Sequence, residues 1–174
     1  MRKHIFSILS LLTIVLLITS CGAQKKGASS TSGPTASQWK SGVKGKWVLN
    51  SVSRQDIPQS FTVKNIFDEA PVDCFIGSVW NITGGSQQGS ITFNASGTLC
   101  ANGAVRTIVW SIFSPQNGEP EFQFKKIYAG DKPSNVTSGY RLELSYADQD
   151  KLVMKMPVDL PNGKLGYLIF NFTK

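Results

Sequence analysis

The sequence predicts an all-β fold, an eight-stranded antiparallel up-and-down β-barrel. Three observations support this: apolar and polar side chains alternate, turn residues recur at short intervals, and only one stretch has a helical pattern. The alternation is clearest in residues 140–146, YRLELSY. A strand with one buried and one solvated face has this pattern because successive side chains point to opposite faces. Strands that follow one another through short connections favour a barrel, because closure removes the exposed edges of an open sheet.

Eight runs have this character. The predicted strands are Gly45 to Val52, Phe75 to Ile82, Gly89 to Asn94, Arg106 to Phe113, Glu121 to Tyr128, Gly139 to Tyr146, Lys151 to Val158 and Leu165 to Phe172. Pro, Gly, Asn and Asp lie between them, and Asn162-Gly163 suits a tight hairpin. We expect one short helix, Thr62 to Glu69, in the long first connection, which could cover one end of the barrel.

The N-terminus has the features of a bacterial lipoprotein signal peptide. Basic residues 2–4 precede the apolar stretch 5–18, which has signal-peptide length and is shorter than the roughly 20 residues of a membrane-spanning helix. The stretch ends in LITSCG at 17–22, which looks like a lipobox. We therefore predict that Met1 to Ser20 are removed and that Cys21 becomes the acylated first residue. An ordinary signal peptide that ends near a Cys by coincidence is the alternative.

Acylation of Cys21 predicts a membrane anchor. Each buried methylene group contributes about 0.8 kcal/mol, so two or three acyl chains such as palmitate hold a protein on a membrane essentially permanently. Residues 21–42 are predicted to be a lipidated flexible tether, because their Gly, Ser, Thr and Ala cannot bury enough apolar surface to fold. A single folded domain, Val43 to Lys174, is long enough to bury a core of its own.

The charge pattern disfavours a nucleic-acid partner. The net charge is +7, and the loss of Arg2 and Lys3 with the signal peptide lowers it by two, to +5. The basic side chains are scattered, apart from the pairs at 25–26 and 125–126. Binding to RNA or DNA would need a continuous basic stripe with interleaved aromatic side chains. Attraction to anionic lipid headgroups is the milder interpretation.

The titratable residues argue against an enzyme. The only histidine, His4, lies in the predicted signal peptide, so the mature chain has no imidazole for general-base or metal chemistry. We expect no catalytic residue, no metal and no cofactor. A carboxylate-based hydrolase stays open, since a glycosidase needs only two acidic side chains. However, Asp68, Glu69 and Asp73 cluster in a turn-rich loop, where solvated charges are the ordinary explanation, and Glu143 is expected to face water.

Cys74 and Cys100 are the only thiols that remain once Cys21 is acylated. In an oxidising compartment such a pair tends to form a disulfide. Closing a loop of about 27 residues stabilises the fold by roughly 3 to 4 kcal/mol in the chain-entropy model. The rival interpretation, a redox or metal-binding thiol pair, lacks a Cys-x-x-Cys spacing and a histidine partner.

The predicted strands are rich in aromatic and other apolar residues, which allows two interpretations. In a small barrel such side chains can fill the interior completely. In a barrel that is wider at its mouth, they line a pocket for a lipid, sterol or pigment-like molecule. The candidate ligand-binding residues are Trp80, Trp110, Phe122, Phe124, Tyr140, Leu142, Leu144, Met154 and Met156.

Gly45-Lys46-Trp47, on the first predicted strand, resembles the Gly-x-Trp signature of lipocalins. Residues 43–174 as a whole are similar to the lipocalin-like lipoproteins of Bacteroidota. That group is expected to have a segment like DCFIGSVW at 73–80, then a second Cys like Cys100, then a run like RTIVW at 106–110. The resemblance implies a barrel with a cavity for small apolar molecules.

One feature departs from the lipocalin pattern. Lipocalins usually stack an Arg from the last strand over the signature Trp, whereas the C-terminal region here offers only Lys174 or Lys164. We therefore expect the closed end to be built differently, with Arg141 or Arg106 over the Trp47 ring.

Together these features predict a non-enzymatic, membrane-tethered barrel that holds or ferries a small hydrophobic molecule. We expect it at the outer membrane or elsewhere in the cell envelope. Residues 22–27 lack the acidic cluster that marks surface display in Bacteroidota lipoproteins, which favours a periplasm-facing anchor. The alternative is a solid barrel that acts as an interaction module. Its loops, especially Arg54 to Asp73, would then dock another envelope protein or inhibit a protease.

Overall fold

The computed structural model describes residues 33–161 and 163–174, and residues 34–174 form one compact unit. The predicted signal peptide, Cys21 and most of the predicted tether lie outside the described residues, as does Asn162 of the predicted last hairpin. Within the part that is described, no helix is both long enough and apolar enough to cross a membrane.

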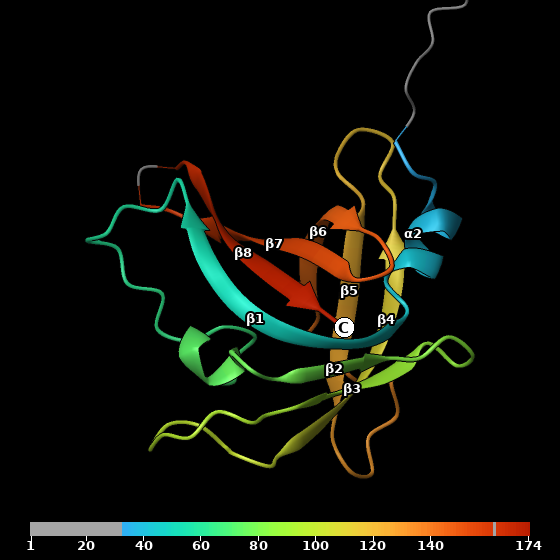
Figure 1. Ribbon diagram of the computed structural model, residues 1–174, viewed down its shortest axis with the longest axis horizontal. Coiled ribbons are helices and arrows are strands. Elements are labelled where there is room, and N and C mark those ends of the chain that lie inside the picture. Colours follow the sequence, from blue (N-terminus) through green and yellow to red (C-terminus); the bar gives the residue numbers. More distant parts are fainter. Residues whose placement is uncertain (1–32, 162) are drawn as a thin grey trace, which may run out of the picture. The chain divides into compact units, whose positions relative to one another are not determined.

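Eight antiparallel strands in the described residues close into a barrel with up-and-down topology (Figure 1). Each strand pairs with its neighbours in the chain, and β1 also pairs with β8, so that the sheet is closed. The strands are β1 (Gly45–Gln55), β2 (Val79–Ile82), β3 (Gln88–Thr92), β4 (Val105–Phe113), β5 (Glu121–Ile127), β6 (Tyr140–Ala147), β7 (Lys151–Asp159) and β8 (Leu165–Thr173). The predicted fold class is therefore confirmed.

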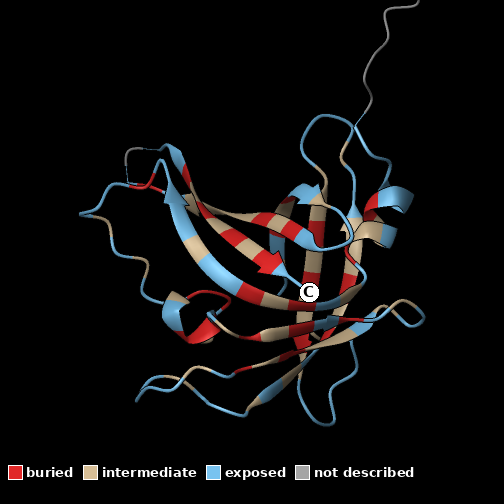
Figure 2. Cartoon of the chain, viewed as in Figure 1, coloured by how far each residue is buried: buried red, intermediate tan, exposed pale blue. Residues whose placement is uncertain are grey.

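Burial alternates along the strands, as the predicted pattern requires (Figure 2). In β5, Phe122 and Phe124 are buried, whereas Gln123 between them is only half-buried. In β8, Leu168, Phe170 and Phe172 are buried in the same way. The apolar members of each strand thus face the barrel interior, where they form one hydrophobic core.

The folded part begins earlier than the sequence predicted. Residues 36–42, assigned to the tether, form helix α2 (Ala36–Gly42), and Thr35 and Gln38 complete a capping box at its N-terminus. The Thr35 side chain accepts from the backbone of Gln38, and the Gln38 side chain accepts from the backbone of Thr35. Trp39 is buried against the core, and the apolar surface of this one residue holds the segment on the barrel.

The predicted helix over Thr62 to Glu69 is wrong. Residues 67–69 form a turn, closed by an antiparallel bridge between Ile66 and Ala70. Phe67 and Asp68 have φ angles of 53° and 47°, which a right-handed helix excludes. A single turn of 3-10 helix, η2 (Val72–Phe75), follows, so that β2 begins at Val79 rather than at Phe75.

The barrel has a closed end, where β1 begins and β8 ends. Trp47 is fully buried there, and its indole Nε1 donates to the carbonyl oxygen of Val43 at 2.8 Å. The Lys174 ammonium lies 4.8 Å from the centroid of the Trp47 ring. The expectation that Arg141 or Arg106 covers this ring is therefore wrong, because the last residue of the chain already takes that place.

The other end of the barrel is called the mouth below. It carries four connections: residues 56–78 between β1 and β2, residues 93–104 between β3 and β4, residues 128–139 between β5 and β6, and residues 160–164 between β7 and β8. The first of these is named the mouth loop.

Candidate functional site

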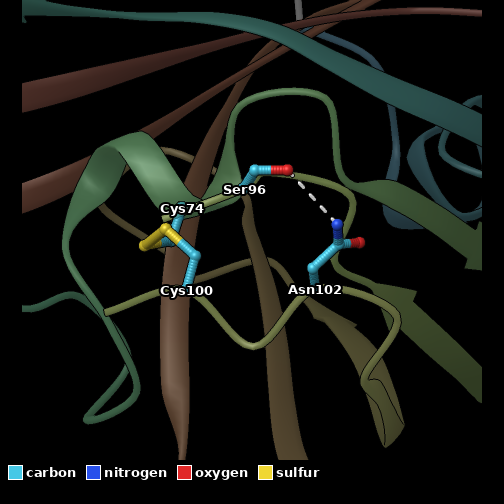
Figure 3. Close-up of a disulfide and its surroundings, with 4 residues drawn as sticks. All are labelled: Cys74, Ser96, Cys100 and Asn102. Carbon is cyan, nitrogen blue, oxygen red and sulfur yellow. Dashed lines mark hydrogen bonds between the residues drawn. A yellow bond between two sulfur atoms is a disulfide. The ribbon is translucent and has the colours of Figure 1, made fainter. Parts of the chain in front are cut away.

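A disulfide joins two of the mouth connections. Cys74 in η2 is bonded to Cys100, which lies between β3 and β4, with an S–S distance of 1.99 Å (Figure 3). Nearby, the Asn102 side chain donates to the Ser96 hydroxyl at 3.4 Å. The predicted pairing is confirmed. It attaches the C-terminal part of the mouth loop to the connection beside it, but leaves residues 56–71 outside this link.

Phe67, from the mouth loop, fills the mouth of the barrel. It is buried, and its ring lies among five other aromatic rings. The centroid distances are 5.1 Å to Phe124, 5.4 Å to Phe75, 5.5 Å to Tyr140, 5.8 Å to Phe170 and 6.1 Å to Trp80. The position that an apolar guest would take in an open barrel is therefore occupied by a side chain of the protein itself.

The backbone at this plug is strained. Phe67 and Asp68 are consecutive non-glycine residues with positive φ. A side chain costs roughly 1 to 2 kcal/mol in this region, because its Cβ approaches the following carbonyl oxygen. The packing of the Phe67 ring must outweigh that cost, so the net stability of the closed loop is smaller than the burial of the ring suggests.

Glu69 is held by two basic side chains from the barrel. Its Oε1 accepts from Arg106 Nη2 at 2.8 Å and from Arg106 Nε at 2.9 Å. Its Oε2 accepts from Lys126 Nζ at 2.9 Å. The Glu69 side chain is only 12% exposed and the Lys126 side chain 8%. The expectation that Glu69 is a solvated loop charge is therefore wrong, because its partners lie on strands that only the fold brings near.

Arg106 and Lys126 reach the mouth because they share the inward face of their strands. Arg106 alternates with Ile108 and Trp110 on β4, and Lys126 alternates with Phe122 and Phe124 on β5. Both residues lie at the mouth end of their strands. Sequence analysis missed this pair, although the period-two pattern that predicted the strands also assigns both cations to the interior.

The ion pairs shift the pKa values of all three groups. Burial alone would raise the pKa of Glu69, but the hydrogen bonds and charges of Arg106 and Lys126 outweigh it and lower that pKa. Burial alone would lower the pKa of Lys126, but the hydrogen bond and charge of Glu69 raise it. The hydrogen bond to Glu69 also raises the pKa of Arg106. All three groups are therefore charged at neutral pH.

Tyr140 and Asp68 extend this cluster towards solvent. The Tyr140 hydroxyl donates to Asp68 Oδ2 at 3.2 Å, and Lys126 Nζ donates to the Asp68 carbonyl oxygen at 3.3 Å. The Lys126 ammonium also lies 5.4 Å from the centroid of the Tyr140 ring. Burial and the charge of Asp68 raise the pKa of Tyr140 despite the nearby lysine. The phenol is therefore a neutral donor at the rim.

The barrel wall opens beside the plug. β6 and β7 pair from Ala147–Leu152 to Glu143–Lys155, whereas residues 156–159 of β7 pair only with β8. An open hollow of about 480 Å³ lies in this split, with Phe67 among the side chains that line it. A second hollow of about 230 Å³ adjoins Lys126. Asp68 and Tyr140 line both hollows, whereas Phe67 lines only the larger one.

Most of the predicted ligand-binding residues lie in the packed core. The fully buried ones are Trp80, Trp110, Phe122, Phe124, Leu142, Leu144 and Met154. Their rings contact one another, for example Trp110 and Phe122 with centroids 5.7 Å apart. Tyr140 and Met156 are half-buried, and both line the hollow between β6 and β7. The structure therefore concentrates the candidate site at the mouth.

The remaining acidic residues lie apart from the ion-pair cluster at the mouth. Among residues 33–161 and 163–174, no group of three or more His, Cys, Asp or Glu side chains could hold a metal ion. Glu143 is half-buried rather than fully exposed as expected. Burial, together with the charges of Glu119 and Glu121, raises its pKa. Asp73 lies in the first turn of η2 and is exposed.

No protein-family model, curated protein or solved structure matches this chain. The similarity to lipocalins therefore rests on the Gly45-Lys46-Trp47 signature and on the residues described with it. The function has to be argued from the geometry of the mouth.

Proposed function

We propose that this chain is a membrane-anchored, lipocalin-like protein that binds a small hydrophobic ligand in the cell envelope, and that the site is the barrel mouth. One observation carries the proposal. The apolar space between the aromatic side chains of the mouth is filled by Phe67, a loop residue, and not by a strand residue. A loop residue can leave without breaking any pairing of the barrel.

The energetic balance supports an exchange of Phe67 for a ligand. Full burial of a Phe side chain contributes about 1.5 to 3 kcal/mol. The positive φ angles of Phe67 and Asp68 cost a comparable amount, which the loop regains when it opens. An apolar ligand that covers the same rings replaces the lost burial. It also gains the hollow of about 480 Å³ beside the plug, which lies within the size range of ordinary ligand pockets.

The second candidate is an interaction module with a solid core, which is favoured by the filled interior below the plug. Trp80, Trp110 and Phe122 leave no exposed surface there for a guest. A ligand that entered the deep barrel would have to displace strand residues, whose removal typically costs about 3 to 5 kcal/mol each. The ligand hypothesis is therefore restricted to the mouth.

Phe67→Ala tests the proposal. The full chain, expressed with its own N-terminus and reconstituted in phosphatidylcholine nanodiscs, is irradiated with a diazirine-bearing hexadecanol. Attachment sites are mapped by peptide mass spectrometry. We expect saturable labelling of peptides at the mouth, competed by unlabelled hexadecanol. Phe67→Ala should lower the half-saturating concentration of the hexadecanol probe about tenfold, because the Phe67 ring no longer competes with the probe for the mouth.

The matched control is Phe113→Ala, which removes an exposed Phe from β4. Its half-saturating concentration for the hexadecanol probe should equal that of the wild type. If neither the wild type nor Phe67→Ala shows saturable labelling at the mouth, the ligand function is wrong. The solid interaction module then becomes the better explanation, and crosslinking in intact cells would be the next experiment.

The anchor is the second part of the proposal. It is supported by the basic start of the chain, the apolar stretch 5–18 and the LITSCG motif at 17–22. Cys21→Ser should abolish incorporation of radiolabelled palmitate and move the protein out of the membrane fraction. Cys100→Ser is the matched control, and it should keep the label. Palmitate on the Cys21→Ser protein would contradict the assignment.

A further inference from the structure

The mouth loop carries an anion next to its apolar plug. Phe67 fills the aromatic part of the mouth, and Glu69, two residues further on, places its carboxylate on Arg106 and Lys126. The turn between them is short, since Glu69 N donates to the Ile66 carbonyl oxygen at 3.1 Å. The loop thus presents an apolar group and a carboxylate a short distance apart, as a small acidic amphiphile would.

The receptor for that carboxylate belongs to the barrel and not to the loop. Arg106 and Lys126 are strand residues on the inward face of β4 and β5. Lys126 is only 7% exposed. In the described residues, Glu69 is the only carboxylate whose side chain contacts either of these cations. Asp68 offers Lys126 its backbone oxygen, while its carboxylate accepts from Tyr140.

Opening the loop therefore has an electrostatic consequence. Phe67 and Glu69 are too close in sequence to leave separately, so a ligand that displaces the ring also removes the carboxylate. A neutral ligand would leave the nearly buried Lys126 and the partly exposed Arg106 without a carboxylate, which is costly above all for Lys126. A ligand with its own carboxylate restores the charge-assisted hydrogen bonds, including a two-bond contact with the guanidinium group.

We infer that the ligand of the barrel mouth is a carboxylic acid with an apolar body, whose carboxylate takes the place of Glu69 on Arg106 and Lys126 while its apolar part takes the place of Phe67. This inference rests on the proposed function and specifies its ligand class. The protein as described is then the self-occupied form, in which residues 67–69 act as an internal competitor for the site.

Two variants separate the role of the cations from that of the loop. Glu69→Gln breaks both ion pairs of the cluster, whereas Lys126→Gln breaks one and leaves the contact between Glu69 and Arg106. Both variants should loosen the mouth loop, Glu69→Gln more than Lys126→Gln. Only Glu69→Gln keeps both cations available for a ligand. Glu119→Gln and Lys132→Gln are matched controls, because both residues are exposed and lie outside the ion-pair cluster.

The experiment compares an acid with an alcohol of the same length. The full chain in phosphatidylcholine nanodiscs is labelled, at about pH 9, with diazirine-bearing hexadecanoic acid or with diazirine-bearing hexadecanol. A carboxylic acid is ionised at this pH and lysine remains charged. In Glu69→Gln, the half-saturating concentration of the acid should be about tenfold below that of the alcohol. In Lys126→Gln this preference should disappear, whereas labelling by the alcohol should remain saturable.

The outcomes distinguish the two proposals. An equal preference for acid over alcohol in Glu69→Gln and Lys126→Gln would overturn the carboxylate inference and leave the hydrophobic site intact. Absence of saturable labelling by both probes in every variant, Phe67→Ala included, would overturn the proposed function as well. If Lys126→Gln fails to show cooperative thermal unfolding, Arg106→Gln replaces it, since it removes the other cation from the same carboxylate.

Discussion

The two ends of the barrel are sealed in different ways. At the closed end, helix α2 and Trp47 are neighbours in sequence, and the Trp47 indole bonds to Val43 only four residues away. At the mouth, the seal is a loop with consecutive positive φ angles, and Glu69 finds its partners 37 and 57 residues further along the chain. The closed end is sealed mainly by a strand residue, Trp47, whereas the mouth is sealed by loop residues that combine an apolar ring with ion pairs.

The difference indicates which end can open. Apolar packing such as that of Trp47 is lost only when the core itself is disrupted, because no other group can replace it. The contacts of Glu69 can be exchanged for those of another anion at little net cost, and strain at Phe67 and Asp68 favours release. The closed end thus stabilises the fold, while the mouth is suited to binding.

Removal of Trp47 should have the largest effect. Trp47→Ala eliminates a fully buried indole and its hydrogen bond, so we expect the free energy of unfolding to fall by about 3 to 5 kcal/mol. Urea denaturation followed by circular dichroism measures the change. Phe113→Ala, at an exposed position of β4, should stay within about 0.5 kcal/mol of the wild type. A small decrease in the free energy of unfolding of Trp47→Ala would mean that packing at the closed end is not the main source of stability.

Loss of the disulfide should come next. The Cys74→Ala, Cys100→Ala double variant removes a crosslink with a sequence separation of 26 residues, which predicts a loss of about 3 to 4 kcal/mol. The effect should be confined to the mouth, so limited proteolysis is expected to cut the mouth loop before any strand. Cleavage that begins near α2 instead would reverse the assignment of the two ends.

The ion-pair cluster should show a pH signature. Glu69→Gln leaves Arg106 and Lys126 without their carboxylate, so we expect a loss of about 2 to 4 kcal/mol at neutral pH. Because folding lowers the pKa of Glu69, its contribution is fully present above the ordinary value of 4.5 and is lost as the pH falls through the lower, folded value.

The same cluster has a limit at alkaline pH. Folding raises the pKa of Lys126, so its contribution is complete below the ordinary value of 10.5 and is lost as the pH rises through the folded value. Chemical denaturation of the wild type and Glu69→Gln from acidic to alkaline pH measures the difference in their free energies of unfolding. This difference should be constant around neutral pH and should decrease at both the acidic and the alkaline limit. Glu119→Gln should show no such profile. A difference that does not change with pH would exclude the ion pairs as its cause.

The cation over the signature Trp should contribute least. Lys174→Ala removes an ammonium 4.8 Å from the Trp47 ring, and such a contact contributes about 0.5 to 1 kcal/mol at an exposed position. The shift in the urea midpoint should be small, and Lys174→Arg should preserve stability. A loss as large as that of Trp47→Ala would show that the chain terminus, and not the indole, closes this end.

The strands could be predicted because their signal is local. In residues 140–146 the identity of each side chain alone specifies the face on which it lies, and the structure follows that pattern until the register shift between Leu144 and Tyr146. The disulfide was also predictable, since acylation of Cys21 would leave Cys74 and Cys100 as the only two thiols. Helix α2 was missed because only one of its residues, Trp39, is buried. A single apolar side chain cannot produce the repeat of apolar residues by which a helix is predicted from sequence.

The alternation within each segment was enough to predict eight strands, an antiparallel barrel and the face of most strand residues, because each segment carries this pattern independently of the others. The positions of Phe67 in the mouth and of Glu69 on Arg106 and Lys126 follow from the folded chain and from no segment of it alone. Such contacts depend on the path of a long loop across the end of the barrel. That path is set by packing between residues far apart in the chain, which no local pattern encodes.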